Sequence, residues 1–289
     1  MSWRLFAIAF LAAWSIAPSV VHSEPSPPKR PLKIYIVTDL EGASGVYKFA
    51  QTREVENPLY RPACEYLMGD IAAVVRGLRE AGVDEILILD GHGHQAFIPH
   101  LMVPGAKYIT GLPRPRGLCG LDETYSGLIF VGQHPMAGTS DGILSHTQSS
   151  KSENRYWYNG VESGELAQVA IYASHFGVPT VMVTGDEAAC REARKFFGET
   201  CITVAVKQGL ARESGALYPF EETRKALYDA AKRVAAAVPL CRPYTIQFPA
   251  KAKKEYLVFE PGPDGKLSTK GKLTTKEGEI AAPLQIFDF

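Results

Sequence analysis

The sequence predicts an α/β fold, with a mostly parallel open sheet, helices on both of its faces and a smaller strand-rich segment at the C-terminus. Short apolar runs that end in turn residues recur along the chain, at 34–38, 86–90, 128–132 and 178–186. Such runs are typical of strands buried in a parallel sheet. Helical periodicity at 62–81 separates the first two runs, and a strand, a helix and a second strand in succession favour a right-handed parallel crossover.

The remaining elements are expected in the order in which their patterns occur. The helix at 62–81 carries Leu67, Ile71 and Leu78 on one apolar face and ends at Gly82. Further helices are expected to open within 160–165 and to cover 187–197 and 219–238. Short strands are expected at 106–110, 202–206, 244–248 and 255–259. From residue 261 onward the chain is rich in Gly, Lys and Thr and has no helical period.

The N-terminus has the pattern of a secretory signal peptide at 1–23. A short positive start precedes an apolar run at 5–16, and Val21-His22-Ser23 precede a proline-rich spacer at 24–32. The apolar run is short for a membrane span, which needs about 20 residues. We therefore expect an α/β domain at 33–248, a strand- and turn-rich segment at 249–289, a periplasmic or secreted location, and no membrane association after cleavage.

Composition excludes some partners and leaves others open. The chain has 31 basic and 31 acidic residues, so nothing in its charge favours nucleic acid or an anionic membrane. Export would permit disulfides among the five cysteines, although an odd number leaves at least one thiol unpaired. Cys190 and Cys201 flank one expected helix and are the best candidate pair.

Three predicted strands end in side chains that suit a metal ion. Asp39 and Glu41 follow the first strand, His92 follows the second and His134 follows the third. The carboxyl ends of parallel strands meet at one edge of a sheet, where ligands bind. Two close carboxylates repel each other unless a cation or a shared proton holds them, and mixed carboxylates and imidazoles suit zinc. A single Asp-x-Glu pair could simply be solvated. Acidic or histidine side chains at the ends of three strands instead favour a metal site.

Two residues further along the chain have competing interpretations. Glu165 lies in the first turn of an expected helix, where an acidic residue commonly complements the helix dipole. His146 lies in a polar loop after the third strand and could be a surface histidine hydrogen-bonded to that loop. His94, two residues beyond His92, has no assigned role.

Taken in order, the motifs resemble the D-aminopeptidase family of dinuclear zinc metallopeptidases. The matching segments extend over most of the chain from about 33 to about 248; they are Asp39-Leu40-Glu41-Gly42, Asp90-Gly91-His92, Gly132-Gln133-His134, Leu144-Ser145-His146, Gly164-Glu165-Leu166, Gly185-Asp186 and Val206-Lys207-Gln208. The resemblance implies that two Zn²⁺ ions per subunit are bound by Asp39, Glu41, His92, His134 and Glu165. It also implies that His146 is the catalytic histidine.

The resemblance leads to a specific functional hypothesis. We expect an exported dinuclear zinc aminopeptidase that hydrolyses short peptides or aminoacyl amides, with an N-terminal D-amino acid, and a homo-oligomer of the ring-decamer type implied by the family. The alternatives are a metal-dependent amidase or hydrolase of other substrates, and a non-enzymatic exported solute-binding protein. The lysine-rich C-terminus departs from the family pattern, which ordinarily ends in a helix.

Overall fold

The computed structural model describes residues 30–93, 95–259 and 271–289. The predicted signal peptide and most of the spacer, at 1–29, lie outside the described residues, as do His94 and the stretch 260–270. Within the described part of the chain, no helix combines the length and the apolar character that crossing a membrane requires.

The larger sheet is open and mostly parallel, as the sequence predicts. Its spatial order is β3-β2-β1-β4-β7-β8-β9, and every neighbouring pair is parallel except β8 and β9. The strands are β1 (Lys33–Thr38), β2 (Glu85–Asp90), β3 (Lys107–Ile109), β4 (Gly127–Gln133), β7 (Thr180–Asp186), β8 (Ile202–Ala211) and β9 (Ser214–Leu217). The central strands β1 and β4 are buried along almost their whole length, which explains their unbroken apolar runs.

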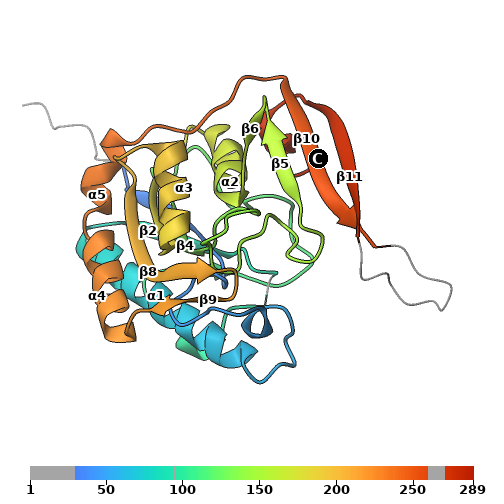
Figure 1. Cartoon of the computed structure of the whole chain (residues 1–289). Coiled ribbons are helices and arrows are strands. Elements are labelled where there is room, and N and C mark those ends of the chain that lie inside the picture. The colour runs from blue at the N-terminus through green and yellow to red at the C-terminus, as the bar shows by residue number, and fades with distance from the viewer. Residues whose placement is uncertain (1–29, 94, 260–270) are drawn as a thin grey trace, which may run out of the picture. The chain divides into compact units, whose positions relative to one another are not determined.

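Helices cover both faces of this sheet (Figure 1). The side chains of β1 alternate between the faces, so Ile34 and Ile36 pack with Leu67 of one helix layer, whereas Tyr35 packs with Leu166 of the other. The first layer comprises α1 (Tyr60–Glu80), α4 (Phe220–Ala231) and α5 (Val234–Ala237), and the second comprises α2 (Glu165–Ser174) and α3 (Glu187–Phe197). Short 3₁₀ turns lie at Phe49–Gln51, Pro99–Leu101, Val238–Leu240 and Pro283–Gln285.

A second, antiparallel sheet has the order β11-β10-β5-β6. Its strands are β5 (Arg155–Tyr158), β6 (Val161–Glu162), β10 (Ala250–Val258) and β11 (Lys272–Ile280), so the C-terminal strands pair with a hairpin from the middle of the chain (Figure 1). Tyr156, Tyr158 and Ile280 pack against Ile171 of α2. This small core attaches the C-terminal segment to the helix layer that also carries Glu165.

Several predicted elements differ from the structure. Residues 244–248 form no strand, because Tyr244, Ile246 and Phe248 pack against the core of the second sheet without pairing with a neighbouring strand. The expected helix 219–238 is interrupted between α4 and α5. The start of the helix expected at 160–165 is instead the strand β6, whereas β10 and β11 agree with the strand- and turn-rich segment expected at 249–289.

The predicted Cys190–Cys201 disulfide is wrong, since all five cysteines are free thiols in the structure. Cys190 lies inside α3, and Cys201 follows the end of that helix.

Candidate metal centre

The loop that follows β1 is anchored on the end of β4. The Asp39 amide donates a hydrogen bond to the Val131 carbonyl (2.9 Å), and the Gly42 amide donates one to the Gly132 carbonyl (2.7 Å). A Cβ atom at residue 42 would lie only 2.2 Å from the Gln133 carbonyl oxygen. Glycine is therefore required at this position, and its close approach fixes the carboxylates on either side of Leu40 at the edge of the sheet.

Lys207 of β8 binds the backbone of the same loop. Its buried ammonium donates to the carbonyls of Glu41 (2.6 Å), Ala43 (2.9 Å) and Val46 (2.5 Å), which uses all three of its N–H bonds. Burial lowers the pKa of Lys207 to about 8, while nearby carboxylates, Asp186 first among them, oppose the fall. The side chain therefore stays mainly protonated at pH 7. Its ammonium group stabilises the three carbonyl groups of the loop that carries Asp39 and Glu41.

Asp39, Glu41 and His92 form what we call the first group. The His92 Nδ1 atom lies 3.2 Å from Asp39 Oδ1 and 2.8 Å from Glu41 Oε2. The other ring nitrogen, Nε2, lies 2.9 Å from the Thr52 carbonyl, which can only accept a hydrogen bond. That contact places the proton on Nε2 and leaves the Nδ1 lone pair facing the two carboxylates.

His134, His146 and Glu165 form the second group. The Nδ1 atom of His134 donates to the Pro135 carbonyl (3.0 Å), so its Nε2 lone pair faces Glu165 Oε1 at 3.4 Å. His146 likewise donates from Nδ1 to the Leu144 carbonyl (2.7 Å). The two imidazole rings are stacked, with centroids 3.8 Å apart and planes inclined by 16°.

Asp39 lies between the two groups and faces both. Its Oδ1 atom is the one near His92, and its Oδ2 atom lies 3.2 Å from His134 Nε2. Within each group, the candidate ligand atoms all lie within 4.8 Å of one another. A carboxylate that presents one oxygen to each of two neighbouring ligand sets is the arrangement expected of a bridging ligand.

The residues present fit divalent metal ions. Glu41 Oε2 and His134 Nε2 are buried and have no hydrogen-bond partner among the described residues, although each lies close to other candidate ligands. A buried polar atom without a partner costs free energy, and a shared cation removes that cost. A set of carboxylate oxygens and neutral imidazole nitrogens suits zinc in particular.

In the metal-free protein, the histidines and carboxylates of the centre perturb one another strongly. Burial raises the pKa of Asp39, but His134 and His92 more than offset it, so that the pKa lies well below its ordinary value. Burial also raises the pKa of Glu165, and His134 brings the net value down to about 2. Correspondingly, burial lowers the pKa of His92 and of His134, but the adjacent carboxylates raise both well above the usual value. Without metal, both nitrogens of each ring are therefore protonated near pH 7, and the lone pairs on His92 Nδ1 and His134 Nε2 belong to the neutral imidazoles that a metal ion would bind.

His146 differs from the other two histidines. Burial lowers its pKa, and the neighbouring His134 lowers it further. The imidazole is therefore neutral near pH 7, with its proton on Nδ1 and a free lone pair on Nε2. A group in this state can accept a proton at Nε2.

Two buried carboxylates support the loops on either side of the centre. Asp70 accepts a hydrogen bond from the Ser44 amide (2.8 Å), in the loop that carries Glu41, and burial raises its pKa to about 6. Glu192 accepts one from the Met136 amide (2.8 Å), close to His134, and burial raises its pKa to about 7. Neither residue was predicted from the sequence to belong to the site.

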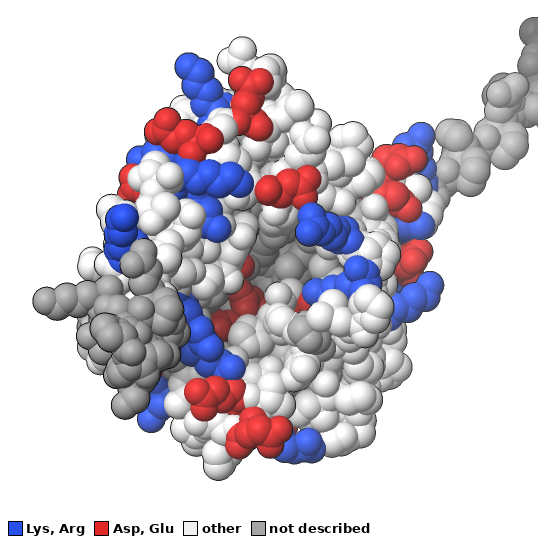
Figure 2. All heavy atoms as spheres, turned by 90° about the vertical axis from the view of Figure 1, so that its right-hand side faces the viewer, with Lys and Arg blue, Asp and Glu red and all other residues white. Residues whose placement is uncertain are grey.

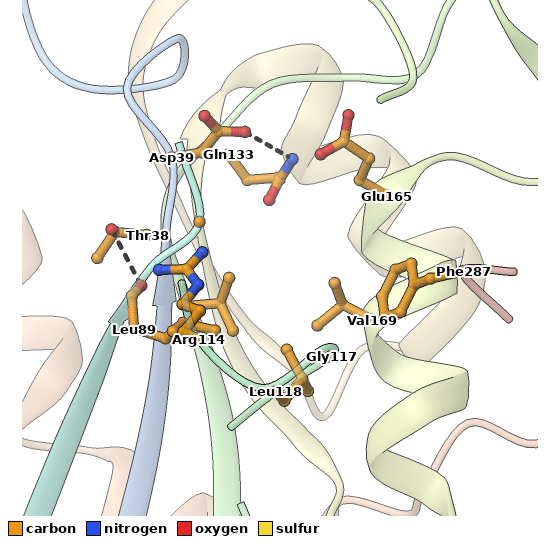
Figure 3. A pocket seen from close by; sticks show the side chains of 12 residues that line it. Thr38, Asp39, Leu89, Arg114, Gly117, Leu118, Gln133, Glu165, Val169 and Phe287 are labelled. Atoms are coloured by element: carbon orange, nitrogen blue, oxygen red, sulfur yellow. Dashed lines mark hydrogen bonds between the residues drawn. The ribbon is translucent and has the colours of Figure 1, made fainter. Parts of the chain in front are cut away.

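Two cavities open onto the centre from different sides. One, of about 310 Å³, is lined by polar residues that include Thr52, Arg53, His146, Gln148 and Ser149, together with ligands of both groups. The other, of about 230 Å³, has both apolar and polar walls and is shown in Figure 3. Figure 2 shows a hollow in one face of the molecule, with acidic side chains on its floor and basic side chains along its rim.

The structure brings together all six residues singled out from the sequence: Asp39, Glu41, His92, His134, His146 and Glu165. Asp90 does not belong to the centre, because its Oδ2 atom accepts hydrogen bonds from the Ala96 amide (3.0 Å) and the Thr110 hydroxyl (3.1 Å). Sequence reasoning gave no role to Lys207. No local signal reveals its buried position, because Thr203 and Gln208 make the strand around it partly polar.

Comparison with known proteins identifies the family. A sequence model described as D-aminopeptidase matches residues 32–257. The chain belongs to the D-aminopeptidase family. It is accordingly a hydrolase of the metallo-aminopeptidase class, which confirms the family expected from the motifs and excludes a non-enzymatic solute-binding protein.

One of the relatives with a similar sequence is itself a D-aminopeptidase. The chain is 29% identical over 259 residues to a D-aminopeptidase from Bacillus subtilis, covering 82% of this chain and 89% of that protein. Among solved structures, it superimposes with a TM-score of 0.79 and 23% identity on the Zn-dependent D-aminopeptidase DppA from Bacillus subtilis, described as a self-compartmentalizing protease, covering 89% and 94% of the two chains. A GMP reductase from Mycobacterium tuberculosis is 24% identical over 240 residues, which is 49% of its length.

Proposed function

We propose that the protein is an exported, dinuclear zinc-dependent aminopeptidase that releases an N-terminal D-amino acid from short peptides or aminoacyl amides. The observation that carries the proposal is the position of Asp39, whose two carboxylate oxygens face the first and the second group. A site for a single ion would need only one of these groups. The names of the relatives support zinc as the metal and a D-residue as the substrate's first residue.

Asp39, Glu41 and His92 would hold one ion, and His134 and Glu165, together with Asp39, would hold the other. Two such ions, when bound, supply a Lewis acid for the scissile carbonyl and lower the pKa of a water molecule. The hydrogen bonds from His92 to Thr52 and from His134 to Pro135 orient the imidazoles, so that their lone pairs are directed inward without a change of tautomer.

His146 would serve as a proton shuttle or, once protonated at Nε2, as a donor to the developing oxyanion, rather than as a covalent nucleophile. Its neutral imidazole lies in the polar cavity beside the ligands and has a free Nε2 lone pair. It can accept a proton there and then return it to the departing amine. Nucleophilic attack by the ring would duplicate chemistry that the metal centre already provides.

One assay tests the function directly. The purified chain should be freed of metal with a chelator, reloaded with zinc, and assayed on D-alanine amide and L-alanine amide. We expect two zinc ions per chain, together with hydrolysis of the D-amide that appears only after reloading. Hydrolysis of the L-amide alone would contradict the D-selectivity, and one ion at full activity would contradict the dinuclear centre.

Export and assembly are further parts of the proposal. Cleavage after Ser23 would release a chain that begins at Glu24, and N-terminal sequencing of the exported protein tests this. A retained form that begins at Met1 would contradict it. The self-compartmentalizing relative supports a homo-oligomer, with the ring decamer as the expected form, and light scattering on the mature protein would measure its mass.

A further inference from the structure

The smaller cavity, of about 230 Å³, opens onto the metal centre. It shares Asp39 and Glu165 with the metal centre, and these two residues lie at one end of it together with Gln133, whose amide nitrogen donates a hydrogen bond to Asp39 at 3.4 Å (Figure 3). A cube of its volume, 230 Å³, would have an edge of about 6 Å, roughly the length of two residues of extended chain. A ligand that reaches the metal centre from this pocket therefore has room for about one further residue.

The pocket has an apolar wall and a single basic residue. Val169 of α2 and Phe287 of the C-terminal segment line one side, and Leu118 closes the end farther from Asp39 (Figure 3). Arg114 is the only lysine or arginine among the described residues that line the pocket, and its guanidinium lies opposite Val169 and Phe287 (Figure 3). The pocket can therefore accommodate a small apolar group and an anion side by side.

The guanidinium of Arg114 is held in place but is not saturated. Its Nη2 atom donates to the Asp90 carbonyl at 2.8 Å, which fixes the group at the end of β2. Its Nη1 atom is buried and has no hydrogen-bond partner among the described residues. An arginine donor that is positioned but unused is suited to a carboxylate, which it binds more strongly than a neutral acceptor.

The charges around the pocket restrict where such a carboxylate can lie. Asp39 and Glu165 occupy the end that opens onto the metal centre, so an anion there would compete with the ligands for the cations. Arg114 provides a positive charge in the part of the pocket that lies away from Asp39 and Glu165. A substrate could therefore place its scissile bond at the metal centre and a carboxylate of its own at Arg114, about one residue farther along the substrate.

We propose that Arg114 binds the free α-carboxylate of the departing residue, which makes dipeptides preferred substrates over the corresponding amides. This inference rests on the proposed aminopeptidase function and adds to it the chemical class of the leaving group. Phe287 of the C-terminal segment also lines this pocket, on the side that faces the guanidinium of Arg114.

The test compares two substrates that differ only in charge at the C-terminus. D-alanyl-glycine and D-alanyl-glycinamide should be assayed with the zinc-loaded wild-type chain and with Arg114→Gln, Arg114→Lys and Arg116→Gln. Arg116 is a matched control two residues away, since it is exposed and pairs with Asp288 on the surface. We expect Arg114→Gln to lower kcat/KM for the dipeptide by about 10- to 100-fold, mainly through a higher KM, because the lost contact is to a charged group.

The dipeptide amide serves as the internal control for folding. Arg114→Gln should change its kcat/KM by no more than about threefold, Arg114→Lys should keep part of the preference for the dipeptide, and Arg116→Gln should behave as the wild type. Equal losses on both substrates, or no loss on either, would overturn the role of Arg114. A wild-type enzyme that hydrolyses neither substrate after zinc loading would instead contradict the proposed function itself.

Discussion

The loop of the first group is held by backbone hydrogen bonds, a buried lysine and a buried aspartate, whereas the segments of the second group are held by buried carboxyl groups. The loop of Asp39 and Glu41 is fixed by backbone hydrogen bonds to β4 and by Lys207, which binds three of its carbonyls. On the other side, the segment before His146 passes through Leu144 in the left-handed region (φ 54°) and is tied by the Ile143 amide to the carboxylate of Asp186 (2.8 Å).

This difference determines how each half of the centre should respond to perturbation. The loop of the first group should depend chiefly on Lys207, whose pKa is about 8, and on Asp70, whose pKa burial raises to about 6. The second group lies near Glu192, a carboxyl whose pKa burial raises into the neutral range, and should respond to pH. Asp39 contacts both halves, so replacing it should perturb the two halves together.

The largest effect is therefore expected from Asp39→Asn, which keeps the shape of the side chain and removes its charge. Metal content should fall below one ion per chain, and kcat/KM should fall by about 1,000-fold or more, because a bound metal contributes several kcal/mol of charge stabilisation. Elemental analysis of the purified variants measures the first quantity. Glu41→Gln and Glu165→Gln should each cost about one ion, and the exposed Asp122→Asn should cost none.

Unchanged metal stoichiometry in Asp39→Asn would show that this carboxylate does not join the two groups. In that case, the closeness of the two groups would have no functional meaning. The same measurement on His92→Ala would then decide whether the first group binds metal at all.

Lys207→Met should perturb the first group selectively. The substitution leaves three carbonyl groups of the loop without their buried donor, which we expect to cost about 2–4 kcal/mol in the free energy of unfolding. Urea unfolding measures that cost, with Lys107→Met as the control because the Lys107 side chain is 76% exposed. The variant should keep the ion of the second group and lose that of the first. Equal loss of both ions would mean that the two halves are not supported independently.

His146→Ala tests whether the second group contains a residue that acts in catalysis rather than in metal binding. Both ions should remain, while turnover of an aminoacyl amide should fall by about 100-fold with KM nearly unchanged, since the lost interaction belongs to the transition state. Loss of an ion would instead make His146 a ligand, as its place in the second group also permits. Full turnover with both ions bound would leave it without a role.

Much of the fold and part of the centre could be predicted from local sequence patterns. Asp39, Glu41, His92 and His134 come directly after buried strands, and parallel strands deliver their ends to one edge. The interpretation of Glu165 and His146 needed the family resemblance, because a helix start and a polar loop are compatible with several roles. The strand expected at 244–248 was wrong because alternating apolar residues also occur where an irregular segment packs on a core.

The supporting residues could not be predicted for a different physical reason. Lys207 binds a loop more than 160 residues earlier in the chain, at Glu41, Ala43 and Val46. Arg114 is fixed by a carbonyl of β2 and meets Phe287 only across a folded cavity. Such contacts depend on the positions of whole strands and on the path of the C-terminal segment. The local periodicity of apolar residues in the sequence does not predict either of them.

The smallest expected effect concerns Glu192 and the pH dependence of the second group. Burial raises its folded-state pKa to about 7, from an ordinary value of 4.5. Between these two values the folded protein binds more protons at this group than the unfolded chain does. The group's contribution to stability is therefore greatest below pH 4.5 and is lost as the pH rises towards 7.

For the metal-free protein, this loss should amount to about 1 kcal/mol between pH 5.5 and pH 6.5. Glu192→Gln keeps an oxygen that can accept the hydrogen bond from the Met136 amide but cannot ionise. The difference in unfolding free energy between variant and wild type should therefore grow in favour of the variant as the pH rises. Urea unfolding at the two pH values measures it, and Glu199→Gln, an exposed position just beyond α3, should show no such growth. Parallel curves for Glu192→Gln and the wild type would mean that this carboxyl is already ionised at pH 5.5, and the contrast between the two halves of the centre would then have to rest on their backbone contacts alone.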